Sequence, residues 1–197
     1  MILLAFCACF SMQMRAQWGY GVKAGVVYSK QSVGYDMDID SKWGLAAGGI
    51  VTYSLSDHFD LQGELYYANR GYKITIYTDM GAEKAHDWVF SYHYINMPLL
   101  LKCFPTGKGF YLLAGPEPEY LADMKNTIKN WKPEEPVDDT EWKEGHTRWG
   151  CSLVGGIGAI MNNGIFVDLR YNYGLTSALK DGKSKNRSLE LSVGYMF

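Results

Sequence analysis

Nine charged residues occupy positions that would face one common interior if the segments around them are strands. They are six acids and three bases: Lys23, Asp60, Glu64, Lys102, Glu117, Glu119, Asp168, Arg170 and Glu190. Charges removed from water must pair or share water, so we expect a network of ion pairs that stabilises the strand register. The excess of acids leaves room for a bound cation or for a gated polar path for small ions. No ligand spacing identifies a metal, and we expect no cofactor.

A second arrangement could carry hydrolysis. Ser91 and His93 have the same strand parity, and Asp87 or Glu83 could orient the histidine as a base. Residues two apart on a strand are about 7 Å apart, too far for a direct bond between nucleophile and base. A histidine among tyrosines is also typical of a membrane interface, so a lipid hydrolase is only the second alternative.

The elements that must position these side chains are strands, because apolar residues recur at every second position. In the last segment, residues 189, 191, 193, 195 and 197 are apolar and the intervening residues are polar or small. A period of two indicates one face in apolar and one in polar surroundings. The pattern predicts eight strands, at residues 18–29, 43–55, 59–67, 93–102, 110–120, 149–159, 165–173 and 189–197.

The connections between these strands alternate between short and long. Three are tight turns, at residues 56–58, 105–108 and 162–164, the last containing Asn-Gly. Four are long and polar, at residues 30–42, 71–88, 123–146 and 176–187. This alternation predicts an all-β, antiparallel, eight-stranded up-and-down barrel with both termini on the side of the short turns. In outer-membrane barrels the short turns are periplasmic and the long loops extracellular.

Aromatic residues gather near both ends of the predicted strands. Those near the loops are Trp43, Tyr67, Tyr92, Tyr94, Tyr120, Trp149, Tyr171 and Tyr173, and those near the turns are Trp18, Tyr20, Tyr53, Phe59, Phe104, Phe110, Tyr195 and Phe197. Two such bands indicate the two interfaces of a membrane. No run of 18 or more apolar residues follows the first segment, which excludes membrane helices and leaves a transmembrane barrel of the outer membrane.

The first 17 residues are typical of a secretory signal. An apolar run at residues 2–10 precedes Met14-Arg15-Ala16, so we expect cleavage and a barrel domain at residues 18–197. The cysteines Cys103 and Cys151 lie on non-neighbouring strands, which favours small apolar fillers over a disulfide. The net charge of −2 argues against nucleic acid as a partner.

Three prolines fall inside predicted strands. Pro98, Pro116 and Pro118 each remove an N–H donor from the sheet. A closed barrel has no edge strand whose N–H groups lack a partner, so each proline leaves a carbonyl of the neighbouring strand without its hydrogen bond. We therefore expect a bulge or a local irregularity where the fourth and fifth strands meet.

Several motifs resemble the PorT-like outer-membrane β-barrel family of Gram-negative bacteria. They lie at residues 22–25 (VKAG), 61–67 (LQGELYY), 95–102 (INMPLLLK), 114–116 (AGP), 168–172 (DLRYN) and 193–197 (VGYMF). Such families usually carry an acidic residue where this sequence has Asn96. The resemblance covers nearly the whole mature chain and implies the fold and the outer membrane. It implies little about the task, because most members are barrels without an assigned one.

The long loops are where recognition is expected. Trp131 and Trp142 stand among acids and lysines in the third loop, which is typical of contact residues. The last loop is basic, with Lys180, Lys183, Lys185 and Arg187. It suits the phosphates of lipopolysaccharide, although a solvated loop would have the same composition.

These observations lead to one main expectation and two alternatives. The main expectation is an integral outer-membrane barrel that is a non-catalytic structural or partner-binding component, for example of an envelope or secretion assembly. Its partners would be outer-membrane lipid, lipopolysaccharide and a protein at the extracellular loops. The first alternative is a narrow pore for ions or small solutes, and the second is the lipid hydrolase.

Overall fold

The fold of the chain is known from a computed structural model that describes residues 17–33, 39–77, 85–107, 109–129, 147–176 and 184–197. Its strands are β1 (Trp18–Val33), β2 (Ile39–Ser56), β3 (Phe59–Tyr77), β4 (Ala85–Asn96), β5 (Leu99–Cys103), β6 (Phe110–Lys129), β7 (Trp149–Ile160), β8 (Ile165–Gly174) and β9 (Ser184–Met196). Among these residues, no helix is long and apolar enough to cross a membrane.

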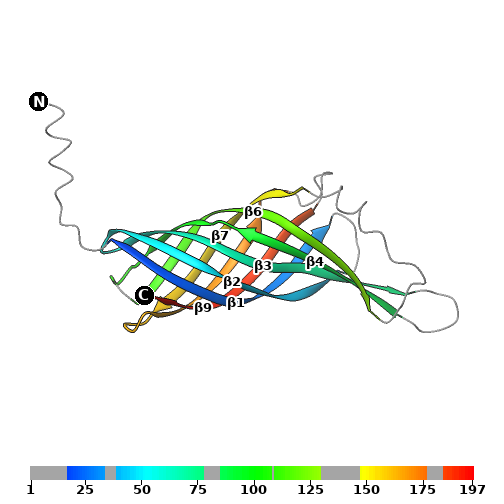
Figure 1. The fold of residues 1–197 in the computed structure, drawn as a ribbon, viewed down its shortest axis with the longest axis horizontal. Helices are drawn as coiled ribbons and strands as arrows, with labels where there is room; N and C mark the ends of the chain where they lie inside the picture. The colour runs from blue at the N-terminus through cyan, green and yellow to red at the C-terminus, as the bar shows by residue number, and fades with distance from the viewer. Residues whose placement is uncertain (1–16, 34–38, 78–84, 108, 130–146, 177–183) are drawn as a thin grey trace, which may run out of the picture.

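The strands form one closed antiparallel ring (Figure 1). The ring closes between the first and last strands, where β1 pairs with β9 over most of its length. β4 and β5 share one position of the ring, because both lie between β3 and β6. The ring therefore has eight positions, which confirms the predicted eight-stranded up-and-down barrel. Both ends of the barrel segment lie together at the short turns, where the N–H of Phe197 donates to the carbonyl of Tyr20 at 2.8 Å.

The predicted fourth strand, at residues 93–102, is interrupted at Pro98, one of the three prolines for which an irregularity was predicted. Only Met97 and Pro98 separate β4 from β5. β3 pairs with both strands in one unbroken register. Hydrogen bonds continue through the break, because the Pro98 carbonyl accepts from the N–H of Glu64 at 3.1 Å and the N–H of Met97 donates to the Pro118 carbonyl at 2.9 Å. The pairing of β4 with β6 also contains a one-residue shift. The irregularity is confirmed, and the barrel accommodates it without a change of register on β3.

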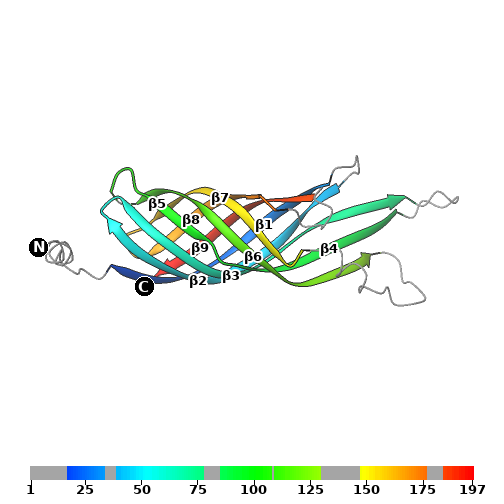
Figure 2. The ribbon, with the colours of Figure 1, turned by 90° about the horizontal axis from the view of Figure 1, so that it is seen from above.

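Several strands are longer than predicted. β3 continues to Tyr77 and β6 to Lys129, while β4 begins at Ala85, so the flanks of the predicted loops 71–88 and 123–146 are strand. The predicted limit of the third strand was wrong because its apolar positions change from odd numbers up to Tyr67 to even numbers at Tyr72, Ile74 and Ile76, so the pattern is interrupted between them. These three strands pair with one another and extend beyond β7 and β8 (Figure 2). We call this three-stranded extension of β3, β4 and β6 the high wall.

The outer face of the ring is apolar and the inner face is polar. Leucine, valine and isoleucine side chains are exposed along the outside of most strands, whereas charged and amide side chains are buried inside. A water-soluble barrel has the opposite arrangement. Lipid therefore covers the outer face, as in outer-membrane barrels.

Most of the predicted aromatic residues face outward near the strand ends. Those with exposed rings are Trp18, Tyr20, Trp43, Phe59, Tyr67, Phe110, Trp149, Tyr171, Tyr195 and Phe197. The prediction was wrong for Tyr92 and Tyr94, which are only 3% and 5% exposed and point into the lumen. It was also wrong for Phe104, which packs on Tyr111 with ring centroids 5.6 Å apart. Proximity to a strand end does not determine which face a ring occupies.

Glycines make room for the largest rings in the lumen. A Cβ at Gly158 would lie 2.4 Å from the Tyr111 ring, and one at Gly194 would lie 2.2 Å from the Phe166 ring. Tyr111 and Phe166 are both fully buried. Small residues opposite large ones let a narrow barrel fill its own interior.

A charge on the lipid face is expected to destabilise the barrel according to its depth. Leu169→Arg, at mid-strand between Leu191 and Ile157, should lower the free energy of unfolding by about 2–4 kcal/mol. The control Leu55→Arg, at the turn end of β2, should cost at most about 1 kcal/mol. Urea titration of tryptophan fluorescence in lipid vesicles measures both. Equal losses would contradict the assignment of the lipid face.

Candidate functional site

The lumen gathers the charged residues singled out in the sequence. Eight of the nine are buried: Lys23, Glu64, Lys102, Glu117, Glu119, Asp168, Arg170 and Glu190. The exception is Asp60, which is half-buried and lines an open cavity of about 900 Å³ at the turn end of the barrel. The alternation of residues on the strands was sufficient to place all eight.

Arg170 on β8 binds two carboxylates at once. Its Nε and Nη2 donate to the two oxygens of Asp168 at 2.9 and 2.8 Å. Its Nη1 donates to Glu64 Oε2 on β3 at 2.9 Å, and its Nη2 lies 2.9 Å from Glu64 Oε1. The planar guanidinium therefore joins opposite walls of the barrel through paired hydrogen bonds, a geometry that lysine lacks.

Lys23 on β1 extends this group to a third wall. Its Nζ lies 2.8 Å from Glu64 Oε2 and 2.8 Å from Glu190 Oε1 on β9. Glu190 also accepts a hydrogen bond from the Ser192 hydroxyl at 2.7 Å. Glu64 thus has two cations as neighbours, and Gln62 donates to it as well.

Arg70 on β3 is a buried cation that the sequence analysis missed. Its Nη2 lies 2.7 Å from Glu117 Oε1 and its Nη1 2.7 Å from Glu119 Oε2, both on β6. It was missed because the third strand was predicted to end at Tyr67. The signal was present, since Arg70 continues the even-numbered inward positions of β3.

Tyr66 links the two groups of ion pairs. Its hydroxyl donates to Glu117 Oε2 at 2.6 Å, and the Lys23 Nζ lies 3.7 Å from the centre of its ring. The ring is fully buried. One side chain therefore contacts an anion of the Arg70 group and a cation of the Arg170 group, and the two groups form one layer across the lumen, which we call the ion-pair layer.

The buried charges are nearly balanced, which corrects the expectation of a large excess of acids. Arg70 adds a base, and Asp60 lies outside the layer, so five buried carboxylates face four buried cations. Within the described residues, no group of three or more His, Cys, Asp or Glu side chains is placed to hold a metal ion. The buried groups therefore carry a formal excess of one negative charge, against an excess of three in the set predicted from the sequence.

Lys102 differs from the other buried cations. Within the described part of the chain its Nζ makes no ion pair, but it lies 4.1 Å from the centre of the Tyr111 ring and 5.5 Å from that of Phe166. It is 3% exposed. Two aromatic faces therefore contribute to stabilising its charge.

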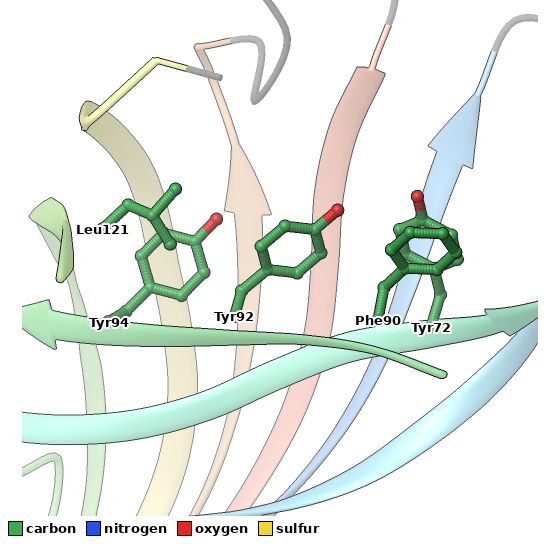
Figure 3. Close-up of a cluster of buried hydrophobic side chains, with 5 residues drawn as sticks. All are labelled: Tyr72, Phe90, Tyr92, Tyr94 and Leu121. Atoms are coloured by element: carbon green, nitrogen blue, oxygen red, sulfur yellow. The ribbon is translucent and has the colours of Figure 1, made fainter. Parts of the chain in front are cut away.

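Aromatic side chains fill the lumen on the extracellular side of the ion-pair layer. Tyr72, Phe90, Tyr92, Tyr94 and Leu121 form a buried cluster. Figure 3 shows these side chains on one side of the ribbon of β3 and β4, directed across the barrel interior. The rings of Tyr72 and Phe90 stack with centroids 4.8 Å apart. The ion-pair layer is thus covered by an aromatic layer.

Comparison with known proteins agrees with this architecture. Residues 11–180 match the family model described as outer membrane protein beta-barrel domain. The chain belongs to this family. The protein is therefore located in the cell outer membrane, as predicted. No curated protein matches the chain.

Solved structures of small outer-membrane barrels are similar to this barrel domain. Neisserial surface protein A matches with a TM-score of 0.57 and 14% identity over 90% of this chain and 97% of that chain. Ail, the attachment invasion locus protein of Yersinia pestis, has a TM-score of 0.49 and 15% identity over 92% of this chain and 99% of its own. OprG from Pseudomonas aeruginosa has a TM-score of 0.45 and 16% identity over 91% and 95%. At such identities the likeness concerns the fold alone.

The residues considered for hydrolysis have separate partners in this beta-barrel domain. The His93 Nδ1 is hydrogen-bonded to the Tyr67 hydroxyl. The Ser91 hydroxyl accepts a hydrogen bond from Lys42 Nζ at 2.6 Å, and the same Nζ donates to Asn69 Oδ1. No contact joins Ser91 to His93 within the described residues, so the sequence argument about their spacing is supported.

Most of the predicted loop contacts lie outside the described residues. These are Trp131, Trp142, Lys180 and Lys183, and the side chain of Lys185 is not described either. Arg187 is described: it is exposed at the extracellular end of β9, and its guanidinium lies 5.5 Å from the centre of the Tyr173 ring. The predicted signal segment also lies outside the described residues apart from Gln17, whereas Cys103 and Cys151 are free thiols.

Removing a cation that forms ion pairs should lower the free energy of unfolding more than removing a cation without a carboxylate partner. Arg170→Met leaves Asp168 without its cation and removes one of the two cations beside Glu64. We expect the free energy of unfolding to fall by about 3–5 kcal/mol. The matched variant Lys102→Met should lose clearly less, because no described carboxylate is in ion-pair contact with Lys102. Urea titration in vesicles measures both. Similar losses would mean that Arg170 contributes through packing alone.

Proposed function

We propose that this barrel is a non-conducting, non-catalytic component of the outer membrane that binds a partner at its extracellular end. The observation that carries the proposal is the ion-pair layer. Four cations and five carboxylates occupy an interior that eight strands make only wide enough for side chains. Opening a path for solutes would separate charges that hold one another at 2.7–2.9 Å. The ion-pair layer acts as a plug that closes the lumen, which favours a membrane-anchored binding protein over a channel.

The high wall supports the partner-binding part of the proposal. β4 remains hydrogen-bonded to both β3 and β6 beyond the end of β8, so the segments at the extracellular ends of these strands start from a paired sheet. Binding residues are commonly carried on loops held by such a scaffold. The third long loop, which contains Trp131 and Trp142, follows β6 directly.

The finer family assignment is also a proposal. The motifs at residues 95–102 and 168–172 resemble PorT-like barrels, whose name comes from a secretion-associated member. Two of their residues have structural roles here: Pro98 lies at the break in the wall, and Arg170 is central to the ion-pair layer. A role in an envelope or secretion assembly follows from this resemblance and requires its own test.

The plug predicts an electrically silent protein. Purified barrel in a planar bilayer should produce no single-channel steps in potassium chloride, because the lumen side chains leave no path wide enough for a hydrated ion. The alternative, a narrow pore, predicts steady steps that weaken when Glu117→Gln or Lys102→Met neutralises the lumen. A large porin measured in the same bilayers controls for insertion. Steps that respond to these substitutions would replace our proposal by the pore.

Partner binding predicts specific capture at the third loop. A photoreactive residue at Trp131 or Trp142 in cells should crosslink to one reproducible protein, identified by mass spectrometry. The control carries the same residue at Leu169, on the lipid face, and should capture lipid only. If the loop positions capture only what Leu169 captures, the partner-binding proposal is wrong.

A further inference from the structure

Charges on the outer wall are confined to one end of the barrel. Among the outward-facing strand positions that the structure describes, the charged side chains are Lys30, Asp40, Lys73, Asp123, Lys125 and Arg187. All of them lie near the ends of strands away from the short turns, which is the extracellular end. Between this rim and the turns, the outer wall carries no charged side chain in the described residues. The rim is therefore basic where the outer leaflet begins.

The wall formed by β1, β9 and β8 has graded polarity. Register places residues in rows across these three strands. From the extracellular end the rows are Lys30, Arg187 and Tyr173, then Tyr28, Leu189 and Tyr171, then Val26, Leu191 and Leu169, then Ala24, Val193 and Val167. A cationic row lies over an aromatic row, which lies over aliphatic rows. The order of these rows matches the order of headgroup, interface and acyl chains in a lipid.

Lys30 and Arg187 stand directly opposite each other on β1 and β9. Both side chains are exposed on the same face. Like charges at opposed positions of an antiparallel pair repel, so the pairing alone is unfavourable. Within the described chain neither side chain makes an ion pair with a carboxylate. An anion located between them would relieve the repulsion.

The other cations of the rim have neighbours that supply oxygen atoms or negative charge. Lys73 stands opposite Asp40 across β3 and β2. Lys42, beside it, donates to Asn69 and Ser91. Lys125 is two residues from Asp123 on the same face of β6. The pair on β1 and β9 differs, because in the described residues neither Lys30 nor Arg187 stands opposite a carboxylate or forms an ion pair.

We propose that Lys30 and Arg187 bind a phosphate group of a glycolipid of the outer leaflet. Arg187 offers a planar fork of donors and is oriented by its contact with the Tyr173 ring, while Lys30 adds a point charge from the facing strand. The rings of Tyr28 and Tyr171 lie at the level of the sugar, and the aliphatic rows below contact the acyl chains. This inference concerns the outer wall and does not depend on the plugged lumen or on a protein partner.

Native mass spectrometry of the detergent-solubilised full chain can test the site, with bisphosphorylated lipid A as the probe. The variant Lys30→Gln/Arg187→Gln should bind at least about tenfold more weakly than wild type. The matched control Lys73→Gln/Lys125→Gln removes the same charge from the rim on another wall and should bind like wild type. Fully dephosphorylated lipid A should bind all three proteins equally weakly.

Two further measurements identify the chemistry. Arg187→Lys keeps the charge and loses the fork, so it should show intermediate binding, which tests the site even if the double variant folds poorly. Raising the salt concentration to about 0.5 M should weaken wild-type binding, whereas inorganic phosphate at millimolar concentration should compete little, because it lacks the acyl contacts. Equal loss in both double variants, or equal loss with dephosphorylated lipid A, would overturn the proposal.

Discussion

The neutralisation of buried charge inside a narrow barrel is the constraint on which the rest of the structure depends. Eight strands leave no room for bulk water, so a buried cation needs a stabilising neighbour, which for Lys23, Arg70 and Arg170 is a carboxylate from another wall. Glu64 meets this need for both Lys23 and Arg170, and Tyr66 connects them to the Arg70 group. A slip of one residue between any two strands would turn these side chains toward lipid. Ion pairing therefore specifies the register as well as filling the interior.

Alternation in the sequence was sufficient for the faces and insufficient for the strand ends. It placed Lys102 and Glu190 in the lumen and Leu169 on the lipid side, because a period of two is imposed by the different solvents of the two faces. It missed Arg70 because the third strand was predicted to end at Tyr67, and it misplaced Tyr92 because a ring near a strand end can face either side of the wall. The position of Arg70 as the partner of Glu117 needed the three-dimensional register of β3 and β6.

The pairing partners within the site were also beyond the sequence. Six acids and three bases permit many pairings, and only the closed ring brings β3 face to face with β8 across the lumen. The cation–aromatic environment of Lys102 illustrates the same limit, since Tyr111 and Phe166 reach it because Gly158 and Gly194 leave space for their rings. Contacts between distant strands are a property of the shear of the barrel, which no local pattern encodes.

The strands of this barrel extend to unequal heights, so its two sides differ. The high wall rises on the side of β3, β4 and β6, while β8 ends at Gly174 on the other side. Among the described residues, the hydrogen-bonded sheet is therefore taller on one side of the barrel axis than on the other. The rim lacks rotational symmetry, so a partner of the kind that we propose would meet this sheet in one orientation about the barrel axis.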